Sequence, residues 1–154
     1  MIFIHYWFIN RQVAVPPRCY FLNQNSFGSF IEQWNCPELI TPFDVSNCYW
    51  ISAEFLENTI CSMTQLNELN VEGTELNLSN ISRIFLKCQH ISKISITLLE
   101  VVVDMEHLKL ELDCTTLSSL QEGFKKLVSL RLLSYNCSTT TSMNSWVAIL
   151  QLLR

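Results

Sequence analysis

The densest group of side chains that could bind a metal lies in the second half of the chain. It consists of Cys88, His90, His107 and Cys114, and thiolate and imidazole groups are the usual ligands of zinc. The spacing is irregular, however, and Cys88 falls on the apolar stripe of a predicted helix, where a thiol packs as a small hydrophobic group. We therefore interpret these residues as structural and predict no metal site.

Other residues of catalytic type show no catalytic pattern. Any of the seven cysteines could be paired with one of the three histidines, but none lies in a context that would lower a thiol pKa. The carboxylates Asp104, Glu106, Glu111 and Asp113 could imitate a calcium loop, yet they lack a glycine and alternate with leucine. We interpret them as the solvated edge of a strand.

Glycine and cysteine spacing excludes the common catalytic motifs. The three glycines stand at positions 28, 73 and 123, too far apart for a P-loop, a dinucleotide-binding fingerprint or a nucleophile elbow. The closest cysteines, Cys36 and Cys48, are twelve positions apart, and no two histidines are four apart. These spacings exclude CxxC redox sites, zinc fingers and HExxH proteases. We predict that the protein is not an enzyme and needs no cofactor.

Charge is distributed unevenly along the chain, whose formal net charge is -4. No basic residue occurs between Arg18 and Arg83, whereas eight acidic residues do. Nucleic-acid binding is disfavoured, because phosphate groups are bound by clustered Lys and Arg. The acidic stretch is either a surface that attracts a basic protein partner or an ordinary solvated face.

Cysteine usage and hydropathy indicate the compartment. An odd number of widely spaced cysteines is not typical of a secreted disulfide scaffold. No window reaches the run of about 18 uncharged apolar residues that a membrane span needs. We expect a cytoplasmic or nuclear protein that does not bind a membrane.

An internal repeat predicts the strands of the fold. The segments ITPFDVSNC (40–48), LNELNVEGT (66–74) and ISKISITLL (91–99) carry apolar residues at their first, fourth and sixth positions, and their starts are 26 and 25 residues apart. This is the leucine-rich-repeat frame, in which a short strand points three apolar side chains inward. MEHLKLELD (105–113) and LVSLRLLSY (127–135) match as well, although the start at 105 comes only 14 residues after the previous one.

Helical periodicity alternates with these strands. Ser52 is a predicted N-cap, and apolar residues recur at helical spacing behind it and in two later segments. The three stripes are Leu56, Ile60 and Met63, then Leu78, Ile81, Phe85 and Cys88, then Leu117, Leu120, Phe124 and Leu127. A short helix is expected around 27–34 and a last one from about 143 to 153.

We therefore predict an α/β leucine-rich-repeat solenoid of four to five irregular repeats, with short parallel strands on the concave side and helices on the convex side. Residues 36–154 form the repeats. Residues 1–35, which are rich in aromatic residues, form an irregular N-terminal segment or a degenerate repeat.

Two stretches resemble a known family. NCPELITPFDVSNCYWISAEFLENTICSMTQLNELNVEGT and LKCQHISKISIT resemble the cysteine-containing leucine-rich repeats of F-box/LRR proteins, with Cys36, Cys48, Cys61 and Cys88 on or near the cysteine positions of that subtype. The resemblance implies repeats that hold the substrate of an SCF-type ubiquitin ligase. Nothing resembles the LPxE opening of an F-box, so adaptor binding is not expected.

Two alternatives remain open at this point. One is an LRR scaffold or immune-type receptor fragment without a role in ubiquitin transfer, and the other is a truncated product without function. In all but the last reading the chain is a protein-binding module.

The strand register predicts the residues that would face a partner. Side chains that flank the sixth-position residue project from the concave sheet. They are Asp44, Ser46, Asn70, Glu72, Ser95, Thr97, Lys109, Glu111, Arg131 and Leu133. This row begins acidic and ends mixed, so we expect a protein partner or ubiquitination substrate with a basic surface at one end.

Overall fold

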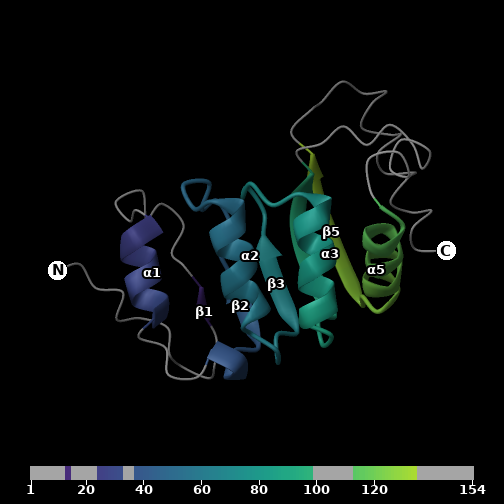
Figure 1. Ribbon diagram of the computed structural model, residues 1–154, viewed down its shortest axis with the longest axis horizontal. Helices are drawn as coiled ribbons and strands as arrows, with labels where there is room; N and C mark the ends of the chain where they lie inside the picture. Colours follow the sequence, from purple (N-terminus) through teal and green to yellow (C-terminus); the bar gives the residue numbers. More distant parts are fainter. Residues whose placement is uncertain (1–12, 15–23, 33–36, 99–112, 135–154) are drawn as a thin grey trace.

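The computed structural model describes residues 13–14, 24–32, 37–98 and 113–134 of the chain. Within these ranges the fold is α/β, with parallel strands in the order β1-β2-β3-β4-β5 (Figure 1). The strands are β1 (Val13–Ala14), β2 (Pro42–Asp44), β3 (Glu68–Val71), β4 (Lys93–Leu98) and β5 (Ser129–Ser134). The helices are α1 (Gln24–Glu32), α2 (Ala53–Cys61), α3 (Leu78–Lys87) and α5 (Cys114–Lys125), with a 3-10 turn at Pro37–Leu39. The predicted α/β class and parallel strands are confirmed.

The described helices pack on one face of the sheet, and Figure 1 shows α2 and α3 in front of the strands. The core lies between the two layers, because alternate strand residues point toward the helices and are buried. The strands contribute Phe43, Leu69, Val71, Ile94 and Ile96 to the core, and Val45, directly after β2, joins them. From the helices it receives Leu56, Ile60, Ile81, Ile84, Phe85, Leu120 and Phe124. The predicted apolar frame is thus confirmed for the first three strand segments.

A repeated backbone turn leads into each of the strands β2 to β5. The N–H of the first frame residue donates to the carbonyl three residues earlier in all four cases. The pairs are Ile40 to Pro37, Leu66 to Met63, Ile91 to Cys88 and Leu127 to Phe124. Between neighbouring units, the carbonyls of Thr41, Asn67 and Ser92 each accept two N–H groups from the next unit. The units therefore repeat in backbone geometry as well as in sequence.

The segment 105–113 does not form a strand between β4 and β5, where the repeat pattern predicted one. Strand β4 pairs directly with β5 over six residues, from Lys93 with Ser129 to Leu98 with Ser134. No strand fits between two strands that share a ladder, so the prediction of an intervening strand is wrong. The unit that starts at Ile91 instead extends 36 residues to Leu127, and residues 99–112 lie outside the described part.

Helix starts are fixed by side-chain caps. The hydroxyl of Ser52 accepts the N–H of Phe55, as predicted, and Asn77 and Asn80 form a reciprocal capping box at α3. Asp113 caps α5 by accepting the N–H of Thr116 at 2.8 Å. Asp113 was expected on a strand edge, and the structure places it at a helix N-terminus instead, because the chain turns into α5 there.

The N-terminal segment contributes structure to the same sheet. β1 pairs with β2, and α1 begins at Gln24, three residues before the predicted start. The Phe27 ring packs edge-on against Trp50 and Phe55, with centroids 5.9 and 6.1 Å apart. The two readings of residues 1–35, a degenerate repeat or an irregular segment, both stay predictions. The helix expected at 143–153 lies outside the described residues.

Candidate interaction surface

The sheet face opposite the helices carries polar side chains in aligned rows. The ladder places Asp44, Asn70, Ser95 and Arg131 in one row across four strands. A second row contains Pro42, Glu68, Lys93 and Ser129. None of the helices that the structure describes packs on this side. We call this surface, with its two rows and the residues Glu72 and Thr97 beside them, the open face.

A hollow of about 410 Å³ lies on the open face. Its lining comes from four strands: Pro42, Phe43, Asp44, Glu68, Leu69, Asn70, Lys93, Ile94, Ser95 and Ser129. The polar side chains of the lining carry amide, hydroxyl, carboxylate and ammonium groups, which can donate or accept hydrogen bonds. Short side chains, above all Ser95 and Ser129, stand among longer neighbours in this lining.

Asp44 and Asn70 are joined and held in fixed orientations. Asn70 Nδ2 donates to Asp44 Oδ2 at 3.1 Å. The other Asp44 oxygen accepts the N–H of Ser46 at 2.9 Å, and Asn70 Oδ1 accepts the N–H of Glu72 at 3.2 Å. Side chains tied to the following backbone in this way form Asx turns. These turns end β2 and β3 and fix the direction in which the two polar groups point.

Glu72 and Arg131 form an ion pair across β4. Arg131 Nε lies 2.9 Å from Glu72 Oε1, without the geometry of a hydrogen bond. The Glu72 side chain is 15% exposed and that of Arg131 is 69% exposed. Beside them the Thr97 hydroxyl accepts the N–H of Gly73 at 2.7 Å and is buried. Glu72 and Thr97 thus serve mainly to hold the end of the sheet together.

A second ion pair joins the neighbouring strands β3 and β4. Lys93 Nζ lies 2.6 Å from Glu68 Oε1, and their side chains are 53% and 47% exposed. Exposed pairs of this kind contribute about 0 to 1 kcal/mol. Both residues line the hollow, so a bound partner can compete for either charge at little cost.

The structure brings together most of the residues predicted to face a partner, but not all. Asp44, Asn70, Ser95 and Arg131 lie in one row of the open face. Ser46 is half-buried in the turn after β2, and Leu133 pairs with Thr97 in the ladder. Lys109 and Glu111 lie outside the described residues, and the direct pairing of β4 with β5 removes the place in the row assigned to them.

Sequence reasoning missed the second row of the open face. Pro42, Glu68, Lys93 and Ser129 stand two positions before the row of Asp44, so the period of two along a strand assigns them to the same face. The sequence therefore contains the signal for the second row. The prediction was limited to the residues on either side of the sixth position and did not include it. The hollow itself depends on side-chain size in three dimensions and has no one-dimensional signal.

Cys88, one of the four residues considered as zinc ligands, is a packing residue, as predicted. Cys88 is buried, its thiol donates to the Ile60 carbonyl at 3.2 Å, and burial raises its pKa to about 12. A protonated thiol is neither a ligand nor a nucleophile. Cys114, by contrast, is exposed at the start of α5, and His107 lies outside the described residues. Among the described residues, no group of three or more His, Cys, Asp or Glu side chains could hold a metal ion.

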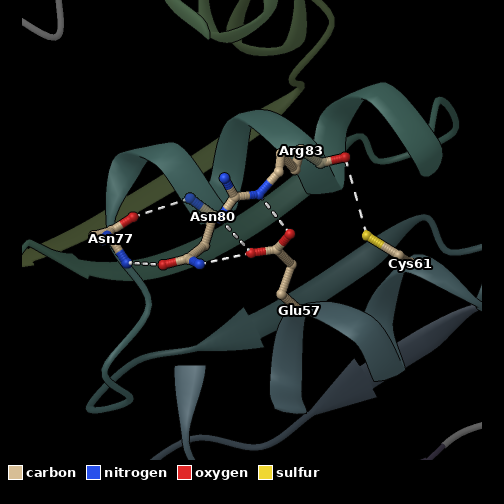
Figure 2. A network of polar contacts seen from close by, with 5 residues as sticks. All are labelled: Glu57, Cys61, Asn77, Asn80 and Arg83. Atoms are coloured by element: carbon tan, nitrogen blue, oxygen red, sulfur yellow. Dashed lines mark hydrogen bonds and ion pairs between the residues drawn. The ribbon is translucent and has the colours of Figure 1, made fainter. Parts of the chain in front are cut away.

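A polar network links α2 to α3 on the helical side of the sheet (Figure 2). Glu57 accepts bonds from Arg83 Nε at 2.5 Å, Arg83 Nη2 at 2.8 Å and Asn80 Nδ2 at 2.6 Å. The hydrogen bond from Arg83 is the main cause that holds the pKa of Glu57 below its ordinary value. Glu57 and Arg83 are 26 residues apart, which is the repeat spacing. The network therefore connects equivalent positions of adjacent units and is a packing device.

Comparisons with known proteins add no assignment. No family model, curated protein or solved structure matches the chain. In the part of the chain that the structure describes, none of the helices has the length and apolar character to cross a membrane. The geometry of the open face is therefore the basis for a function.

Proposed function

We propose that the protein is a protein-binding module of the leucine-rich-repeat type, similar to the substrate-recognition repeats of F-box/LRR ubiquitin-ligase subunits. The proposal places the partner, a ubiquitination substrate, on the open face. Strands at intervals of 26 and 25 residues, with the same entry turn in each unit, support the solenoid architecture.

The observation that carries the proposal is the hollowed, polar open face of a parallel sheet. Parallel sheets in ordinary α/β folds have helices on both faces. In repeat solenoids the helices lie on one side only, and the strands present an extended surface for binding. The open face has this arrangement in the described residues. Its hollow contains both hydrogen-bond donors and hydrogen-bond acceptors.

Recognition by the open face depends more on hydrogen bonds and shape than on a strong negative charge. Glu68 and Glu72 already pair with Lys93 and Arg131. Asp44 has hydrogen bonds to Ser46 and Asn70 but lies in no ion pair with a described residue. The acidic stretch led us to expect a partner with a basic surface. Because Asp44 is the acidic residue of the open face without an ion pair to a described residue, one basic group of the partner near Asp44 is sufficient.

Filling the hollow tests the proposal. Ser95→Trp places a large ring in the hollow, on a half-buried position of the open face, whereas Asn58→Trp places the same residue on the exposed side of α2. The tagged full-length chain and both variants would be used to capture proteins from cells, with circular dichroism as the check on folding. We expect Ser95→Trp to abolish capture of the specific partners and Asn58→Trp to retain it.

The captured proteins separate the alternatives. Ubiquitin-ligase subunits and their substrates support the proposed class, whereas receptors or signalling proteins favour a scaffold. Chaperones alone, or equal capture by wild type and a folded Ser95→Trp variant, would contradict the proposal.

A further inference from the structure

The charges of the open face are divided between its two halves. The acidic residues Asp44, Glu68 and Glu72 belong to β2, β3 and the turn after β3, whereas Lys93 and Arg131 belong to β4 and β5. These five are all the charged residues of the open face as defined above. The face therefore changes from acidic to basic across the strands, not along them.

The first row of the open face sets the distance between an acidic and a basic group. Asp44 and Arg131 stand at its two ends, with the uncharged Asn70 and Ser95 between them. Neighbouring strands lie about 4.8 Å apart, so three intervals separate the two backbones by about 14 Å. An extended chain advances about 3.4 Å per residue, and four residues span the same distance.

Both end groups can accept a further partner. Asp44 accepts one hydrogen bond at each carboxylate oxygen, and a carboxylate has about four acceptor positions. Arg131 meets Glu72 through Nε, and its side chain is 69% exposed, which leaves its terminal amino groups toward solvent. A carboxylate binds such a guanidinium group well.

We propose that the occupant of the open face is an extended segment of the partner protein that lies across the strands and carries a Lys or Arg and an Asp or Glu four residues apart. The basic side chain binds Asp44 and the acidic side chain binds Arg131. An even separation is required, because only residues two or four apart point to the same side of an extended chain. The inference rests on the proposed function and specifies its ligand.

The residue midway between the two charged ones points toward Asn70 and Ser95. These short side chains line the hollow, so the hollow accepts the central side chain of the segment. Complementary charges at both ends of the row set the orientation of the segment and the rate of association more than its affinity.

Two peptides of identical composition test the spacing. The acetylated and amidated peptide TKTSTET carries Lys and Glu four apart, and its isomer TKTSETT carries them three apart, on opposite sides of an extended chain. Each would be titrated into the full ¹⁵N-labelled chain while amide chemical shifts are recorded. We expect saturable shifts at Asp44, Asn70, Ser95 and Arg131, with TKTSTET binding about three- to fivefold more tightly.

A variant of Asp44 identifies the basic contact. Asp44→Asn removes the charge but keeps a side-chain oxygen for the N–H of Ser46, so the turn after β2 is retained. We expect the preference for TKTSTET over TKTSETT to disappear in this variant.

Three results would overturn the inference: equal affinity for the two peptides, no saturable shift with either, or shifts of the same amides that depend on protein concentration alone. The last result would assign the open face to a second copy of this chain. If one of these results is found while Ser95→Trp still abolishes partner capture, the proposed function stands and only the described ligand is wrong.

Discussion

At the scale of single residues, a carboxylate on the helical side of the sheet is held by several hydrogen bonds. Glu57 accepts three hydrogen bonds from Arg83 and Asn80, and its side chain is 13% exposed. Hydrogen bonds to a charged group contribute more than neutral ones, and loss of one partner leaves the others unsatisfied. The network therefore makes α2 and α3 dependent on one ionised group.

The lowered pKa of Glu57 predicts a loss of stability in acid. A carboxyl group whose pKa is lower in the folded than in the unfolded state contributes its full stability above the unfolded pKa of about 4.5. That contribution disappears as the pH falls through the lower, folded pKa. At pH 7 we expect Glu57→Gln to reduce the free energy of unfolding by about 1 to 2 kcal/mol.

Urea unfolding at pH 7 and near pH 3 measures this dependence. The difference between wild type and Glu57→Gln is expected to shrink at the lower pH, and the exposed Glu75→Gln serves as the control. A difference that is the same at both values would show that Glu57 stabilises the fold through packing and not through its charge.

At the scale of secondary-structure elements, the closest approach of two helices depends on a residue without a side chain. Gly123 of α5 faces the ring of Phe85 on α3, and a Cβ atom at Gly123 would lie 2.2 Å from Phe85 Cδ2. The Phe85 ring is itself held edge-on by Phe124, with centroids 5.4 Å apart. A Cβ atom at Gly123 would therefore force the ring or the helix to shift, so the observed packing of α5 on α3 requires glycine at this position.

This packing predicts that Gly123→Ala destabilises the protein, whereas helix propensity alone predicts that it stabilises it. Alanine is favoured over glycine within a helix by about 1 kcal/mol, whereas overpacking a core costs about 1 to 3 kcal/mol. We expect Gly123→Ala to lower the free energy of unfolding by about 1 kcal/mol or more. Thermal unfolding checks this, with the exposed Ser118→Ala on the same helix as a control that is neutral or slightly stabilising. A Gly123→Ala variant more stable than wild type would contradict the described packing of α3 on α5.

The elements that could be predicted from the sequence are those set by local periodicity. The apolar positions of β2, β3 and β4 and the cap at Ser52 follow from residue spacing, which the structure confirms. The segment 105–113 has the same local pattern but does not take the place between β4 and β5. Strand pairing is decided by contacts between distant residues, and a matching local pattern cannot determine it.

The polar details of the open face were less predictable for a similar reason. Alternation along a strand assigns a residue to a face, and it correctly grouped Asp44 with Asn70. It does not reveal that Glu72 is covered through its pair with Arg131, nor that Thr97 is buried. Those properties depend on neighbours on other strands, 24 to 59 residues away in sequence.

At the scale of the whole molecule, the two sides of the sheet have separate roles. The helical side contains the core and the network of Glu57, which stabilise the stack of units. The open face contains the hollow and the exposed ion pair of Lys93 with Glu68, which contributes little to stability and is available for contact. Substitutions on the open face are therefore expected to change binding more than folding, and those on the helical side the reverse.

Site-specific photo-crosslinking tests this division most directly. The photoreactive residue p-benzoylphenylalanine would replace Ser95 on the open face in one sample and the exposed Asn58 on α2 in another, and each full-length protein would be irradiated in cells. The account predicts covalent adducts to a partner protein from position 95 and none from position 58. Adducts from position 58 with none from position 95 would contradict it, because the partner would then bind the helical side.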